Sequence, residues 1–136
     1  MGIGYKEVIP LLNSLQKFQG KKDLRLCELG NNYMKGLEME NWFTGVVSKR
    51  FWDEIGFIHT SIDLNGLDGS LKLDLREDIS EHFEEKFDII YDGGTAEHVE
   101  NQYMCFKNIH NITKNNGLMI HVLPKTGHFP KHCQYY

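Results

Sequence analysis

Three acidic side chains in this sequence lie in or just after short apolar runs, where a ligand could reach them. Glu28 lies near the end of one run (LRLCELG), Asp63 closes a second (FIHTSID), and Asp74 lies in a third, alternating run (LKLDL). Such runs are typical of strands in a buried sheet. Because open α/β sheets bind ligands beyond the carboxyl ends of their strands, the three acids are candidates for one site along that rim.

The first acid stands beside a glycine turn. Gly30 follows Glu28 by two positions, and a glycine there lets the backbone approach a ligand closely. The N–H groups that follow, beginning at Asn31, can meet a negative group, whereas the Glu28 carboxylate suits a cationic or amino group. The competing interpretation is a turn that needs a glycine for its own geometry.

The other two acids suit a nucleoside. A carboxylate at Asp63 can accept hydrogen bonds from both hydroxyls of a ribose, and Leu64 would then cover an adenine face. Asp74 is on the opposite face of its strand from the alternating leucines, so it can bond an adenine amino group. A solvent-facing carboxylate is the alternative for either acid alone, but three in order favour a ligand site.

Alternating strands and helices must position these residues. Five strands are predicted, at 24–29, 57–64, 71–75, 87–91 and 118–123. Helices are predicted from Pro10 to a stop at Gly20, at about 45–54, at 80–86 and at about 96–114, with a loop or broken helix over 31–44. This alternation predicts an α/β fold, a Rossmann-like doubly wound parallel sheet with strand order 3-2-1-4-5.

The longest predicted helix carries an apolar stripe that we expect to face the core. Asn116-Gly117 is predicted to stop this helix. The members of the stripe recur every three or four positions and are Val99, Tyr103, Phe106, Ile109 or His110, and Thr113.

Length and charge narrow the classes of function. The chain has 136 residues, which suits a single domain over 1–136, and 40 % of them are hydrophobic, enough for a core. The net charge is -4 and the basic residues are scattered, so nothing favours nucleic acid as a partner. A small molecule is the expected substrate.

The cysteines and the lengths of the apolar segments indicate the cellular compartment in which the protein is expected to work. Cys27, Cys105 and Cys133 form an odd set without close pairing, which favours a reducing, cytoplasmic environment over a disulfide framework. The first residues, MGIGYKEVIP, lack the pattern of a secretory signal. No stretch approaches the ~20 apolar residues of a membrane helix, so no membrane association is expected.

From about residue 24 to residue 124, the sequence resembles the class I S-adenosylmethionine-dependent methyltransferases. The segment CELG (27–30) resembles the family's first motif, whose acid and glycine line the methionine end of the cofactor. Asp63 resembles the acid that holds the ribose, and Asp74-Leu75 resembles the pair that reads the adenine edge.

The most specific part of the resemblance runs from the fourth predicted strand to the fifth. FDII followed by DGGT resembles the strand-four motif beside the methyl group, EHV resembles the start of the next helix, and NGLMI resembles the entry to strand five. The resemblance implies methyl transfer, with S-adenosylhomocysteine as the product. The cofactor-binding residues it implies, with those inferred above, are Glu28, Gly30, Asn31, Asp63, Leu64, Asp74, Leu75, Asp92 and Gly93.

The sequence departs from the family in three places. The first loop, GNN, has fewer glycines than the usual E-x-G-x-G, and the 35 positions from Glu28 to Asp63 (63 − 28) predict an insertion near 31–44. The family's usual last two strands are missing after the fifth. We therefore expect either a fragment or a minimal version whose fifth strand forms the sheet edge and pairs with a second copy.

Methyl transfer from a sulfonium needs alignment more than acid–base chemistry. A base helps only if the acceptor must lose a proton, and the candidates are Glu97 and His98 at the start of the long helix. Helix capping or packing is the alternative role for His98. No metal is expected, because adjacent residues do not share a helix face.

A second polar cluster, His128, His132 and Cys133 in GHFPKHC, contains zinc-ligand types without a zinc-site spacing. We expect this segment to line the acceptor side, with Phe129, Tyr135 and Tyr136 as apolar cover.

Two other functions compete with methyl transfer. A nicotinamide-dependent dehydrogenase would need G-x-G-x-x-G after the first strand, which is absent. A non-catalytic cofactor-binding or interaction module with a degenerate or truncated methyltransferase fold is the stronger rival, because a fold does not by itself deliver activity. The methyl acceptor is not identified by the sequence.

Overall fold

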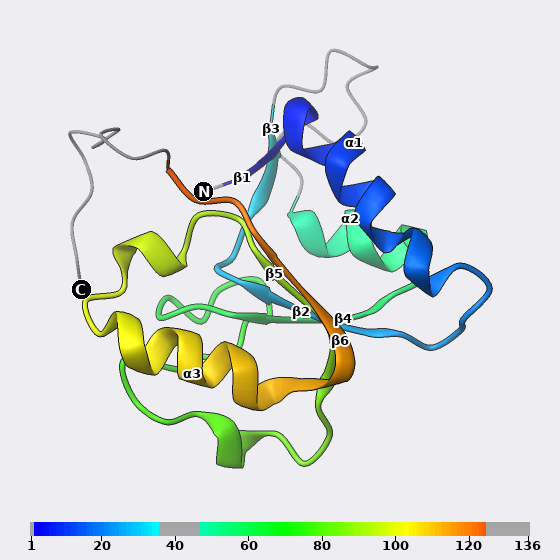
Figure 1. Cartoon of the computed structure of the whole chain (residues 1–136). Helices are drawn as coiled ribbons and strands as arrows, with labels where there is room; N and C mark the ends of the chain where they lie inside the picture. Colours follow the sequence, from blue (N-terminus) through cyan, green and yellow to red (C-terminus); the bar gives the residue numbers. More distant parts are fainter. Residues whose placement is uncertain (1, 36–46, 125–136) are drawn as a thin grey trace.

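A four-stranded parallel sheet lies at the centre of the computed structural model, which describes residues 2–35 and 47–124 (Figure 1). Its strands lie in the order β4-β2-β5-β6, and a separate two-stranded parallel sheet joins β1 to β3. The elements in chain order are β1 (Gly2–Gly4), α1 (Tyr5–Ser14), η1 (Leu15–Phe18), β2 (Arg25–Leu29), β3 (Tyr33–Lys35), α2 (Ser48–Ile55), β4 (Ile58–Ile62), η2 (Ser80–His82), β5 (Phe87–Asp92), η3 (Ala96–His98), α3 (Gln102–Ile112) and β6 (Thr113–His121).

The sheet confirms the predicted α/β class and the order of four of the five predicted strands. The first, second, fourth and fifth predicted strands correspond to β2, β4, β5 and β6. The third, predicted at 71–75, is reduced to one parallel bridge between Leu71 and Ile62 on the free side of β4. The chain leaves the sheet there because the Leu73 N–H turns back to the Leu71 carbonyl at 3.0 Å.

Both faces of the sheet are covered, which explains why its strands read as nearly continuous apolar runs. Figure 1 shows α3 on one side of the sheet and α1 and α2 on the other. Leu29 and Ile90 are buried in the cluster under α3, and Leu26 and Tyr91 are buried in the cluster under α1 and α2. Burial of each such aliphatic side chain contributes about 1.5–3 kcal/mol.

The first helix begins earlier than predicted. α1 begins at Tyr5, so Pro10 lies inside the helix instead of in its first turn. The reason is that Val8 packs on the same core cluster as Leu11, so the apolar face extends to the N-terminal side of the proline. The predicted stop is confirmed, because η1 ends at Phe18 just before Gly20.

The predicted helix over 96–114 is divided, and its predicted apolar stripe is confirmed only in part, because Val99, Ile109 and Thr113 are buried but the other members are not. After η3 the chain is extended, and α3 restarts behind Asn101, whose side chain accepts a hydrogen bond from the Met104 N–H. This restart sets which face is buried, and Tyr103 is 75 % exposed while Phe106 is also exposed. The buried residues of α3 are Cys105, Asn108, Ile109 and Ile112.

The last strand also begins earlier than predicted, directly where α3 ends at Ile112. Asn116 and Gly117, predicted to stop the helix, lie within β6 at a shift of register against β5. Asn116 has a φ of 62°, and a Cβ on Gly117 would stand 2.8 Å from the Lys114 carbonyl oxygen. These two residues therefore form a bulge in the strand, a conformation that glycine permits.

Two shorter predictions need correction as well. The helix predicted at 80–86 is the single turn η2, and the helix predicted at about 45–54 is α2, shifted toward the C-terminus. Within the described ranges, every helix is too short or too polar to cross a bilayer.

Candidate functional site

The carboxyl edge of the sheet contains the point where the chain reverses its direction of strand addition. From the central strand β2 the chain passes to β4 on one side, and it then returns to β5 on the other. The loops that follow β2 and β5 meet at this point of the edge. Such a topological switch point is the place where open α/β sheets bind ligands.

Gly30 and Thr95 join the two loops at this point. The Gly30 N–H donates to the Ile62 carbonyl at 2.7 Å, and Thr95 Oγ1 donates to the Leu29 carbonyl at 2.8 Å. Gly30 has a φ of 87°, and a Cβ added to it would stand 2.4 Å from Thr95 Oγ1. A glycine is therefore required here both by the backbone conformation and by the close approach of the second loop.

Asp63 links the end of β4 to the loop that follows β2. One oxygen of its carboxylate accepts the Asn31 N–H at 2.7 Å, and the other accepts the Asn65 N–H at 2.9 Å. Because each carboxylate oxygen has two lone pairs, a ligand hydroxyl can still bind to each of them. The structure thus brings together three predicted residues, Gly30, Asn31 and Asp63, with the half-buried Leu64 next in the chain.

The Asn31 side chain is held by a second carboxylate. Asn31 Nδ2 donates to Asp68 Oδ2 at 2.6 Å, and the Tyr33 hydroxyl donates to the same oxygen at 3.0 Å. Hydrogen bonds from these two groups, that of Asn31 first, hold the pKa of Asp68 below its ordinary value. The loop after β2 is therefore held by two acids, Asp63 just before the turn at 65–69 and Asp68 within it.

Glu28 is fully buried and engaged by the protein itself. Its carboxylate accepts hydrogen bonds from Asn32 Nδ2 at 3.0 Å and Ser48 Oγ at 2.6 Å, and it lies 2.9 Å from His59 Nε2. Glu28 thus fixes Asn32, whose Oδ1 atom is buried without a hydrogen-bond partner. Sequence reasoning proposed Glu28 but missed Ser48 and His59, which approach it only through the fold.

Asp74 and Leu75 are placed differently from the residues around Gly30. Arg76 forms a side-on ion pair with Asp74, with Nη2 2.5 Å from Oδ2, and this hydrogen bond is the main cause of the lowered pKa of Asp74. The Leu75 side chain is buried in the core under α3. Among the described residues, no hydrogen bond joins this pair to Gly30, Asn31 or Asp63, so their adenine contact stays a prediction.

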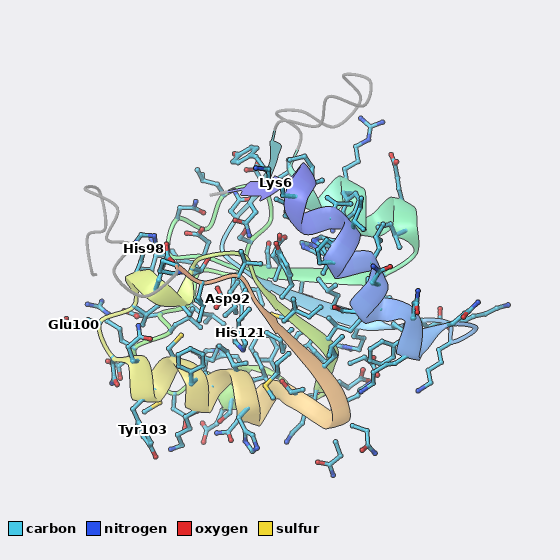
Figure 2. The ribbon with its side chains drawn as sticks, turned by 45° about the horizontal axis from the view of Figure 1, so that its top comes forward. Lys6, Asp92, His98, Glu100, Tyr103 and His121 are labelled. Carbon is cyan, nitrogen blue, oxygen red and sulfur yellow. The ribbon has the colours of Figure 1, made fainter. Side chains whose placement is uncertain are left out.

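Asp92 closes β5 as a buried, multiply bonded carboxylate. Its Oδ1 accepts the N–H groups of Thr95 at 2.9 Å and Ala96 at 3.1 Å, and its Oδ2 lies 3.0 Å from His121 Nδ1. Figure 2 shows Asp92 and His121 facing one another. In the next residue, Gly93, a Cβ would stand 2.9 Å from the ring of Tyr91, so this turn has no room for a side chain.

Sequence reasoning missed His121. The available signal was its position at the end of an apolar run (LMIH) that pairs with the run ending in Asp92. The predicted base candidates, Glu97 and His98, form their own contact at 3.2 Å on η3 although they are adjacent in sequence. The contact joins two adjacent side chains of η3, which are not expected to share a helix face.

Metal ligation finds no support in the described part of the chain, where no group of three or more His, Cys, Asp or Glu side chains is placed to hold an ion. The predicted acceptor-side residues His128, Phe129, His132, Cys133, Tyr135 and Tyr136 lie outside the described residues.

Comparison with protein-family models, curated proteins and solved structures found no match for this chain. The functional conclusion therefore depends on the sequence motifs and on the geometry of the carboxyl edge.

Proposed function

We propose that this chain is an S-adenosylmethionine-dependent methyltransferase that acts on a small-molecule acceptor. The observation that carries the proposal is the junction of Gly30, Asn31 and Asp63 at the switch point of a parallel sheet. The bridge from Leu71 to β4 supports the finer topology, a Rossmann-like sheet in the order 3-2-1-4-5. A nucleoside bound across this edge would have its ribose beside Asp63, which directly follows β4.

The ribose end of the proposed cofactor would be held by Asp63. Its carboxylate is already oriented by two backbone N–H groups, so its free lone pairs are directed before a ligand arrives. Leu64 would cover one adenine face. Asp74 would accept from the adenine amino group, with Arg76 giving up part of its contact.

The methionine end would lie over the loop after β2. The buried Asn32 Oδ1 has no hydrogen-bond partner among the described residues and would accept from the ligand's ammonium group. Such an unpaired buried acceptor costs about 1–3 kcal/mol, which a bound donor would recover. Glu28 holds Asn32 in place and adds a negative charge behind it.

Methyl transfer requires the protein mainly to orient the acceptor and the cofactor. When bound, S-adenosylmethionine supplies an activated methyl carbon. The turn after β5, fixed by Asp92 and Thr95, would hold the acceptor in line with that carbon and keep water away. A small-molecule acceptor fits the net charge of -4 better than a nucleic acid does.

Calorimetric titration with S-adenosylmethionine and S-adenosylhomocysteine tests the proposal. We expect saturable binding that weakens about 10²-fold in Asp63→Ala, because hydrogen bonds to a charged group are each worth about 1.5–3 kcal/mol. Asp63→Asn tests the charge with nearly the same shape. The matched control is Asp53→Ala, which removes an exposed carboxylate paired with Lys49 on α2. Absence of binding to the folded wild-type chain would refute the proposal.

One observation favours a second function, an interaction module without turnover. In the described part of the chain, β6 pairs only with β5, so its other side is a free sheet edge where Met119 is exposed. A second copy could pair along that edge. Sedimentation of a dimer that binds the cofactor but never produces S-adenosylhomocysteine would favour this function over methyl transfer.

A further inference from the structure

Asp92 and His121 form a carboxylate–imidazole pair that the motifs do not account for. The two residues are register partners at the carboxyl ends of β5 and β6. Oδ2 of Asp92 lies 3.0 Å from Nδ1 of His121. The Asp92 side chain is fully buried, whereas 25 % of the His121 side chain is exposed. The pair therefore has its carboxylate in the buried turn after β5 and its imidazole partly exposed at the surface of the same edge.

Both members of the pair are held in position. Two N–H groups, those of Thr95 and Ala96, fix the other oxygen of Asp92. The His121 ring packs against Phe106 of α3, with 5.4 Å between ring centroids and 55° between ring planes. Neither ring nor carboxylate can turn without breaking these contacts, so Asp92 acts as a positioning residue for the imidazole.

The geometry assigns one tautomer of the imidazole. A carboxylate can only accept, so Nδ1 carries the proton and Nε2 of the neutral ring keeps its lone pair. Among the described residues, no group hydrogen-bonds to Nε2 of His121. A buried carboxylate that orients an imidazole in this way is the arrangement of a general base.

Two neighbouring groups are less suited to take a proton. His98 is also paired with a carboxylate, Glu97 Oε1 at 3.2 Å from its Nε2, but its side chain is less exposed than that of His121, 15 % against 25 %. Cys105 of α3 is fully buried, and burial followed by the charge of Asp92 raises the pKa of its thiol to about 12. His121 therefore combines a partly exposed ring with a fixed orientation and, among the described residues, an Nε2 without a hydrogen-bond partner.

We infer that His121 takes a proton from the methyl acceptor, which is then a protic oxygen or nitrogen nucleophile such as a hydroxyl or an amine. The inference rests on the proposed methyl transfer. In the step, Nε2 takes the proton from the O–H or N–H group while the acceptor's electron pair forms a bond to the methyl carbon. The bond from that carbon to sulfur breaks, its electron pair stays on sulfur as a thioether, and the proton passes from Nε2 to solvent.

The tautomer is measured first, by ¹⁵N NMR of histidine-labelled full chain, with His121→Gln used to assign the signals. We expect a protonated Nδ1 and a bare Nε2 in the wild type. In Asp92→Asn, one oxygen can still accept from Thr95 and Ala96, but an NH₂ group faces the ring, so the tautomer should reverse. A wild-type ring that carries its proton on Nε2 would overturn the inference without any variant.

Diethyl pyrocarbonate then probes the bare nitrogen directly, because it acylates unprotonated imidazole. We expect acylation of His121 to slow about tenfold in Asp92→Asn. A tenfold change in the population of the reactive tautomer corresponds to about the free energy of one ordinary hydrogen bond. Acylation of the exposed His82 on η2 serves as the internal control and should not change.

Added S-adenosylmethionine separates the failure of this inference from the failure of the proposed function. If the cofactor binds by calorimetry, it should protect His121 but not His82 from acylation. Binding without protection would place the pair outside the reacting region and overturn the inference. If no cofactor binds, the proposed function is refuted. The role of His121 in methyl transfer is then refuted as well, even if the NMR measurement finds the expected tautomer.

Discussion

Replacement of Gly30 by alanine tests whether the two loops of the candidate site are as closely packed as the structure shows. The new Cβ would stand 2.4 Å from Thr95 Oγ1, and real Cβ atoms essentially never approach other atoms closer than 3.0 Å. The Thr95 hydroxyl would have to rotate away or the loop would have to move. Either change breaks the hydrogen bond from Thr95 to the Leu29 carbonyl.

The expected cost has two parts. An alanine at a φ of 87° carries left-handed backbone strain of about 1–2 kcal/mol. Loss of the Thr95 hydrogen bond and the displacement that goes with it add about 1–2 kcal/mol. The matched control is Gly20→Ala, because Gly20 has a φ of 80° and nothing within 4 Å of the added Cβ. Gly20→Ala should therefore show the strain alone.

Urea unfolding provides the measurement, with wild type, Gly30→Ala, Thr95→Ala and their double variant as a double-mutant cycle and Gly20→Ala as a fifth, control protein. We expect Gly30→Ala to lower the free energy of unfolding by about 3 kcal/mol and Gly20→Ala by about 1 kcal/mol. In a Thr95→Ala background the Oγ1 atom is absent, so Gly30→Ala should cost little more than the control. Equal losses for Gly30→Ala and Gly20→Ala, or no relief from Thr95→Ala, would refute the close packing of the loops.

Three further predictions concern the elements around the site. Asn108 on α3 makes three hydrogen bonds to the backbone of residues 75–79, so Asn108→Ala should lower the free energy of unfolding by about 3 kcal/mol in urea, and a loss below about 1 kcal/mol would contradict this role. Arg76 lowers the pKa of Asp74, so their pairing stabilises the fold above the unfolded-state pKa of Asp74 and is lost as pH falls through its folded pKa. Arg76→Gln should therefore reduce the acid dependence of unfolding below about pH 4, and an unchanged slope would count against the pairing. Burial raises the thiol pKa of Cys27 far above its ordinary value and that of Cys105 to about 12, so neither should react with Ellman's reagent before the chain unfolds.

The central strands could be predicted because strands that are buried on both faces of a sheet have nearly continuous apolar sequences. β2, β4 and β5 fall within one or two residues of their predicted bounds. The buried face of α3 could be predicted only in part, at Ile109, because Asn101 restarts the helix after a break and a period counted across the break loses its phase. Asn108 also misled the pattern, because a polar residue is buried there by bonds to distant backbone.

The candidate site could be predicted where its residues follow strands directly. Gly30 and Asp63 meet because parallel strands end at one edge. The partners of Glu28 could not be predicted, because His59 lies 31 positions away and Ser48 lies 20 positions away. The pairing of Asp92 with His121 depends on strand register, which the bulge at Asn116-Gly117 shifts. Such contacts are decided by tertiary structure rather than by local pattern.

The small β1–β3 sheet has a practical consequence for anyone who labels this protein. β1 begins at Gly2 and pairs in parallel with β3, which starts just after Asn32, and Ile3 and Met34 are fully buried in this pairing. An affinity tag fused at the amino end would therefore act, through β3, on the loop after β2 that carries Gly30 and Asn31. For the same reason, a fluorophore attached at the amino end should report on ligand binding without any substitution in the loop after β2.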